Sequence, residues 1–185
     1  MKKTVLLVIL CFISFVVFAG VSTTQADGGA NRTDLGYGIV VNSASTLHRE
    51  WYALNDTSMG VVFEGTPGIT TSYSKSYLYK TSYSIKPTED LSAINVVFVL
   101  YDVFGNHISN LSTLEVQDLR EGVPYKFTAQ WSATENNVSR YLYCIAYVSK
   151  ARTASGKVYI ADLEPVIQLA LLISPNSKEE DFSTE

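Results

Sequence analysis

Residues 93–102 read AINVVFVLYD, and this stretch indicates the class of fold. β-Branched and aromatic residues dominate it, which is typical of a strand. Both of its faces are apolar, because Ile94, Val96, Phe98 and Leu100 alternate with Val97, Val99 and Tyr101. A strand that is apolar on both faces is covered on both sides and lies inside a sheet. The stretch therefore predicts a central strand of a β protein.

Similar runs continue on either side of this strand, from Gly36 to Ala161, and turn residues separate them. Residues 139–150 repeat the two-faced pattern, with Cys144 as a small core residue. Short strands at this spacing predict an all-β fold, an Ig-like antiparallel β-sandwich. The expected strands are 36–42, 49–54, 59–64, 76–86, 93–102, 107–115, 124–132, 139–150 and 157–161.

The C-terminal part departs from this pattern. Asp162 and Pro165 precede the apolar run 166–173, which predicts a short helix with Asp162 as its N-cap. A final strand is the alternative, because the run is short. Residues 175–185, PNSKEEDFSTE, are charged and are expected to form a disordered acidic tail.

The N-terminus has the features of an export signal. Lys2 and Lys3 precede an apolar run over residues 5–19, and small polar residues follow. Cleavage is expected after Ala26 or, alternatively, after Ala19; an uncleaved signal anchor is a further alternative. We therefore expect a signal peptide over 1–26, a flexible lead-in over 27–35, one sandwich domain over 36–174, and a protein that a prokaryote secretes.

Charge and cysteine content narrow the function classes. The formal net charge is −4, and loss of Lys2 and Lys3 with the signal makes the product more negative still. Such a chain lacks the basic footprint of proteins that bind nucleic acid or anionic membranes. Cys11 leaves with the signal, so Cys144 has no disulfide partner and stability must come from packing. We expect a monomer that meets the membrane only through its signal peptide.

One motif resembles a known family. Phe98-Val-Leu-Tyr-Asp102 matches the pattern for which FxLYD domains are named, and Gly105 follows in the turn after the strand. Phe98, Leu100, Tyr101, Asp102 and Gly105 are read as structural residues, with Asp102 bonding the turn and Gly105 supplying a positive φ. The resemblance implies an Ig-like sandwich from an exported bacterial or archaeal protein, and it implies no activity.

No stretch of sequence carries a recognised catalytic or metal-binding spacing. His48 and His107 are the two histidines, and a spatially assembled triad around either is the alternative to a non-enzymatic protein. We expect no enzyme activity, no cofactor and no metal site.

Aromatic residues offer the best candidates for ligand binding. Tyr73, Tyr77, Tyr79 and Tyr83 lie in a Ser/Tyr-rich stretch, and Trp51 is a further candidate. Tyr mixed with Ser is the composition of adaptable binding surfaces. The competing interpretation, which we favour, is that these tyrosines pack in the core. The sequence thus predicts a secreted binding module for an unidentified envelope protein, or alternatively a carbohydrate-binding domain that uses surface tyrosines.

Overall fold

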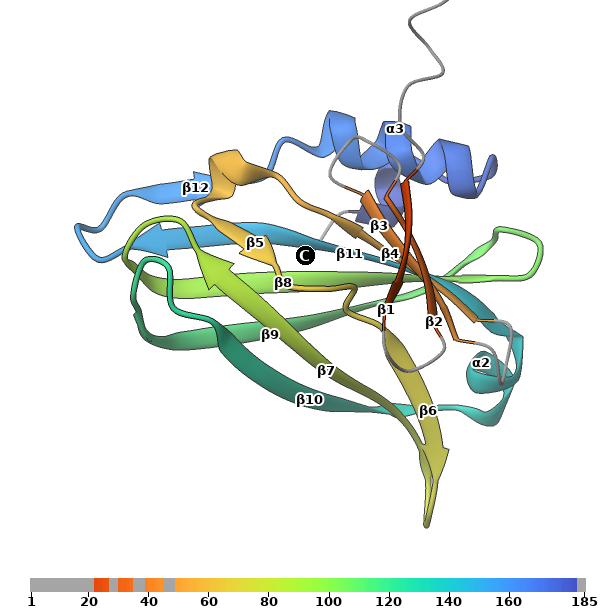
Figure 1. Ribbon diagram of the computed structural model, residues 1–185. Helices are drawn as coiled ribbons and strands as arrows, with labels where there is room; N and C mark the ends of the chain where they lie inside the picture. Colours follow the sequence, from red (N-terminus) through yellow and green to blue (C-terminus); the bar gives the residue numbers. More distant parts are fainter. Residues whose placement is uncertain (1–21, 27–29, 35–38, 45–48, 183–185) are drawn as a thin grey trace, which may run out of the picture.

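The computed structural model describes residues 22–26, 30–34, 39–44 and 49–182, and strands dominate them (Figure 1). They form two sheets, so the predicted all-β sandwich is confirmed. The larger sheet has the order β1-β2-β3-β4-β11-β8-β9, with β12 beside β11; the smaller has the order β10-β7-β5, with β6 beside β7.

The strands of the larger sheet are β1 (Ser22–Ala26), β2 (Ala30–Asp34), β3 (Ile39–Ala44), β4 (Arg49–Leu54), β8 (Leu91–Asp102), β9 (His107–Leu119), β11 (Tyr141–Thr153) and β12 (Val158–Ile160). The smaller sheet holds β5 (Val61–Phe63), β6 (Ile69–Tyr73), β7 (Tyr77–Pro87) and β10 (Tyr125–Ala133). The helices are η1 (Thr57–Met59), α2 (Glu135–Arg140), α3 (Leu163–Ile173) and η2 (Glu179–Phe182).

Strand β8 is buried on both faces, as its sequence predicts. On one face Phe98 meets the smaller sheet, with its ring 5.7 Å from Tyr83 and 5.8 Å from Trp131. On the other face Val97 and Val99 belong to a cluster with residues of α3. Figure 1 shows α3 over the larger sheet, on the side away from β7 and β10. Each aliphatic side chain buried here contributes roughly 1.5–3 kcal/mol.

The turn after β8 forms as the motif suggested. The Asp102 Oδ1 accepts hydrogen bonds from the backbone N–H groups of Phe104 and Asn106, both at 2.9 Å. Gly105 has a φ of 75°, in the left-handed region that favours glycine. The turn is therefore held by the two motif residues expected to hold it.

The C-terminal apolar run is a helix, which excludes the alternative of a final strand. Asp162 caps α3 by accepting a hydrogen bond from the N–H of Glu164 at 3.1 Å. Pro165 lies in the first turn, where it removes no helical hydrogen bond. No helix within the described ranges is long and apolar enough to cross a membrane.

One strand pair differs from the expected antiparallel arrangement. Strands β4 and β11 pair in parallel, with Trp51 opposite Cys144. Almost ninety residues, including the whole smaller sheet, connect the two strands. A connection of that length places no constraint on strand direction, and alternation within one strand does not report it.

Two predicted boundaries are wrong where the structure describes them. Part of the lead-in expected over 27–35 forms strand β2, which pairs with β3. The tail expected to be disordered over 175–185 instead contains η2, in which Phe182 is 1% exposed. Phe182 packs 6.4 Å from the Tyr147 ring, and its carbonyl accepts the Tyr147 hydroxyl at 3.1 Å. A single large apolar side chain thus anchors an otherwise charged segment.

Two local elements were also missed. Strand β6 lies between the expected strands 59–64 and 76–86, where no strand was expected, and α2 begins between the expected strands 124–132 and 139–150. Thr134 caps α2 by accepting the Asn137 N–H at 3.2 Å.

The positive and apolar parts of the expected signal, together with Cys11 and His48, lie outside the described residues.

Candidate functional site

The hairpin of β6 and β7 projects from the body of the molecule (Figure 1). Tyr73 and Tyr77 face each other across its tip, with ring centroids 4.7 Å apart and planes inclined by 47°. Tyr73 is 67% exposed, whereas Tyr77 is half-buried beside Glu135 of α2. Ser74, Lys75 and Ser76 connect the two strands. The tip therefore presents an aromatic pair within a short polar loop.

The other two candidate tyrosines do not reach the surface. Tyr79 is 2% exposed and Tyr83 is 3% exposed, so the possible binding surface is wrong for both, and the favoured interpretation of packing in the core is correct for them. Tyr77, Tyr79 and Tyr83 do share one face of β7, but that face points between the sheets. The Tyr83 hydroxyl lies 2.7 Å from the Thr113 Oγ1 of the opposite sheet. Burial raises the pKa of Tyr83. Tyr83 therefore joins the two sheets.

Trp51 is a packing residue at the root of the hairpin. Its Nε1 donates to the Tyr141 hydroxyl at 3.1 Å. Its ring lies against Gly68, where an added Cβ would come within 2.1 Å of the indole. Gly68 directly precedes β6, so the indole and the glycine set where the hairpin begins. This contact favours a structural role for Trp51 over ligand binding.

A half-buried cation supports the same root. Arg49 donates to the Thr71 Oγ1 at 2.7 Å and lies 5.0 Å above the ring of Tyr141. Burial lowers the pKa of the Arg49 guanidinium, and Tyr141 and Tyr79 act in the opposite direction. The described residues offer Arg49 no carboxylate partner. A cation–π contact and a hydroxyl acceptor therefore hold Arg49 in place.

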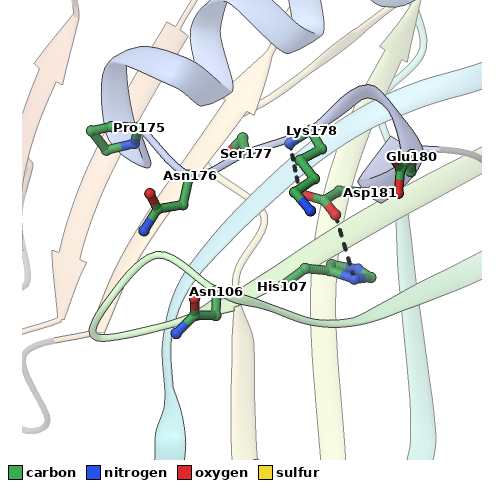
Figure 2. A pocket seen from close by; sticks show the side chains of 8 residues that line it. All are labelled: Asn106, His107, Pro175, Asn176, Ser177, Lys178, Glu180 and Asp181. Carbon is green, nitrogen blue, oxygen red and sulfur yellow. Dashed lines mark hydrogen bonds and ion pairs between the residues drawn. The ribbon is translucent and has the colours of Figure 1, made fainter.

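A second candidate site lies at the other side of the larger sheet. A hollow of about 700 Å³ lies between the β8–β9 turn and the segment that leads into η2. Figure 2 shows the side chains that line it. The Nδ1 of His107 is 3.8 Å from the Asp181 Oδ1, and the Asp181 Oδ2 accepts the Lys178 backbone N–H at 2.9 Å. The lining residues are Asn106, His107, Pro175, Asn176, Ser177, Lys178, Glu180 and Asp181.

The contacts of His107 do not resemble those of a catalytic base. Its Nε2 lies 2.9 Å from the Asn110 Oδ1, and its Nδ1 faces Asp181. In a catalytic triad one imidazole nitrogen faces a nucleophile, whereas here both face other groups. Ser177, the hydroxyl residue of the hollow, is hydrogen-bonded to the Ala170 carbonyl at 3.5 Å. The triad alternative around His107 thus receives no support from this geometry, and the absence of enzyme activity stays a prediction.

This hollow was not among the sites expected from the sequence. Its walls are the β8–β9 turn and a segment that was interpreted as disordered. The signal that could have revealed it is Phe182, a lone aromatic residue in a charged stretch. Among the described residues, no group of three His, Cys, Asp or Glu side chains is arranged to hold a metal ion.

Comparison with known proteins adds little to this picture. No protein-family model and no curated protein matches the chain. Two solved structures are similar to it. One is a Northeast Structural Genomics Consortium target with 16% identity and a TM-score of 0.35, and the match covers 55% of this chain and 80% of that chain. The other is a DUF1425 family member from Shewanella sp. pv-4 with 15% identity and a TM-score of 0.30, and the match covers 69% of this chain and 94% of that chain. Neither similarity is strong enough to carry an argument, so the FxLYD resemblance stays a prediction.

Proposed function

We propose that this protein is a secreted, non-enzymatic β-sandwich module that binds another protein at the cell envelope through the tip of the β6–β7 hairpin. The observation that carries this proposal is the exposed Tyr73 ring, paired with Tyr77 on a projecting hairpin. Tyrosine gives a large contact area at a low cost in conformational entropy, and the serines beside it offer adaptable hydrogen bonds.

The geometry of the tip favours a protein partner over a sugar. A sugar ring stacks on a flat, open aromatic face, but Tyr73 and Tyr77 cover part of each other's faces. The aromatic residues that would have extended a sugar platform, Tyr79 and Tyr83, are buried. Carbohydrate binding is therefore the second candidate, and it depends on Tyr73 alone.

Secretion is supported by the sequence of the first 26 residues. Lys2 and Lys3 precede a long apolar run, and small polar residues follow it. The mass of the protein recovered outside the cytoplasm tests this part. A species that begins at Asp27 or at Gly20 supports export with cleavage, whereas an intact chain confined to the cytoplasm contradicts it.

The binding proposal is tested with Tyr73→Ser, Tyr77→Ser and the double variant. Phe104→Ser is a matched control, because Phe104 is 77% exposed on a different turn. We expect an envelope protein to be cross-linked to the wild type and to Phe104→Ser, and to be lost from the tip variants. Equal cross-linking by all five proteins contradicts the proposal. Saturable binding on a glycan array that Tyr73→Ser abolishes replaces it with the carbohydrate alternative.

A further inference from the structure

Four large aliphatic side chains lie exposed on the outer face of the larger sheet. They are Leu114 at 68%, Val116 at 73%, Val158 at 55% and Ile160 at 71% exposure. The alternate residues of the same strands point the other way: Thr113 bonds Tyr83 of the smaller sheet, and Tyr159 packs against the core between the sheets. The four aliphatic side chains therefore share the face opposite the smaller sheet.

Strand register places these side chains in two parallel rows across the sheet. One row runs from Ile160 through Lys150 and Asn95 to Leu114. The next row runs from Val158 through Arg152 and Ala93 to Val116. Each row crosses four strands, so its two aliphatic ends lie about 14 Å apart. Two aliphatic pairs thus flank a central pair of cations.

The two cations have no partner of their own. Lys150 and Arg152 are both exposed. Within the described part of the chain, neither side chain forms an ion pair or a hydrogen bond. Lys157, by contrast, is engaged: its Nζ lies 4.3 Å from the ring of Tyr159 and donates to the hydroxyl of that residue. The face therefore offers two uncompensated positive charges between apolar side chains.

Helix α3 covers only the neighbouring half of this face. It packs on Val97 and Tyr147 together with the residues beyond them. One step further along each strand, at Asn95 and Lys150, the face becomes solvent-accessible, and the register of β11 shifts there. Helix α3 thus stops covering the sheet before Asn95 and Lys150, and the two aliphatic rows lie in the part of the face that it leaves exposed.

We infer that the surface formed by Leu114, Val116, Lys150, Arg152, Val158 and Ile160 docks a protein segment that presents a carboxylate between two aliphatic side chains. An extended segment that places these groups at alternate positions spans about 13 Å from the first to the last, which matches the length of one row. Carboxylates complement Lys150 and Arg152, and the aliphatic side chains cover the ends of the rows. This surface is separate from the hairpin tip and does not depend on it.

The charge pattern argues against two other occupants. A second copy stacked face to face would bring Lys150 and Arg152 against their own counterparts, which is repulsive. An anionic bilayer would meet the field of the whole molecule, whose net charge is −4. A segment with local carboxylates avoids both penalties.

The probe for this inference is a labelled synthetic peptide in which isoleucine, glutamate and isoleucine occupy alternate positions, separated by threonines. Its binding is measured by fluorescence anisotropy. We expect the double reversal Lys150→Glu with Arg152→Glu to weaken binding about tenfold or more, because it replaces attraction with repulsion. Ile160→Ser with Leu114→Ser should weaken it about as much. Lys80→Glu on the smaller sheet is the matched control and should leave binding unchanged.

Unchanged thermal unfolding of these surface variants shows that any loss of binding is local. Binding that weakens with added salt, and that is absent for a peptide with lysine in place of glutamate, supports the inference. Equal binding of the lysine peptide, or binding that survives the charge reversal, overturns it. Adsorption to phosphatidylglycerol vesicles without peptide binding, or self-association that Leu114→Ser abolishes, assigns the surface to another occupant and also overturns it.

Discussion

Replacement of Asp102 is the sharpest test of how the signature strand ends. Asp102 is 4% exposed, and its own turn covers it. Its Oδ1 accepts the backbone N–H groups of Phe104 and Asn106, and its Oδ2 lies 3.2 Å from the Arg140 guanidinium. Asp102→Ala leaves two backbone donors unsatisfied. Because the turn lies near solvent, each unsatisfied donor should cost an amount at the lower end of the range for buried groups. Asp102→Ala should therefore lower the free energy of unfolding by about 2–3 kcal/mol.

Two companion variants divide this effect into parts. Asp102→Asn keeps an oxygen for the two backbone donors but turns an amide N–H₂ toward Arg140. It should lower the free energy of unfolding by about 1 kcal/mol. Arg140→Ala should cost about 0.5 kcal/mol, because the Arg140 side chain is 44% exposed and solvent screens the ion pair. Urea denaturation at pH 7 gives these values, and Asp102→Ala should also lower the midpoint of thermal unfolding by about 5–10 °C.

The pH dependence supplies a further check. Burial acts to raise the pKa of Asp102, but hydrogen bonds from Asn106 and Phe104 and the charge of Arg140 outweigh it, so the pKa falls below its ordinary 3.8. A lowered folded-state pKa stabilises the protein above the unfolded value, and this stability is lost as the pH falls through the folded value. The difference between wild type and Asp102→Asn should therefore shrink at about pH 3. This reasoning would be refuted if wild type and Asp102→Asn differed in unfolding free energy by the same amount at pH 7 and at about pH 3. Equal losses of unfolding free energy for the Asn and Ala variants would also refute it.

Three further predictions concern the core. Tyr83→Phe should lower the free energy of unfolding, measured by urea denaturation, by about 1–2 kcal/mol, because it leaves Thr113 without its buried partner. Adding Thr113→Val should recover part of this loss, and losses that simply add would contradict the contact. Gly68→Ala should cost about 2 kcal/mol or more, since its Cβ would meet Trp51 at 2.1 Å; an unchanged melting temperature would show that the indole moves freely. Cys144 should not react with Ellman's reagent in the folded protein, because burial raises the pKa of its thiol and excludes the reagent; it should react on unfolding, and rapid reaction of the native protein would contradict its place in the core.

Strand positions were predictable wherever alternation was strong. Strands β8 and β11 carry apolar residues on both faces, and both are buried on both faces in the structure. The Asp102 turn was predictable because side chain and backbone lie within four residues of each other. Local chemistry of this kind depends on neighbours in sequence and so can be read directly.

The candidate binding residues were predictable only in part. Alternation shows that Tyr77, Tyr79 and Tyr83 share a face, but it does not show whether that face points to the core or to solvent. Position along the strand made the difference: Tyr83 lies between the sheets, whereas Tyr77 lies on the hairpin that extends past them. The same limit hid the aliphatic rows, because only the pairing of two intervening strands places Leu114 and Ile160 in one row.

The sequence alone predicted the all-β class, the central position of the 93–102 strand, the turn at Asp102 and the helix capped by Asp162. Each of these depends on contacts within a few residues, or on an alternation that a single strand displays. Only the tertiary structure decided the parallel pairing of β4 with β11, the docking of Phe182, and the side of the sandwich on which each tyrosine lies. These features depend on contacts between segments far apart in the chain, and no periodicity within one segment encodes which distant surface will cover it.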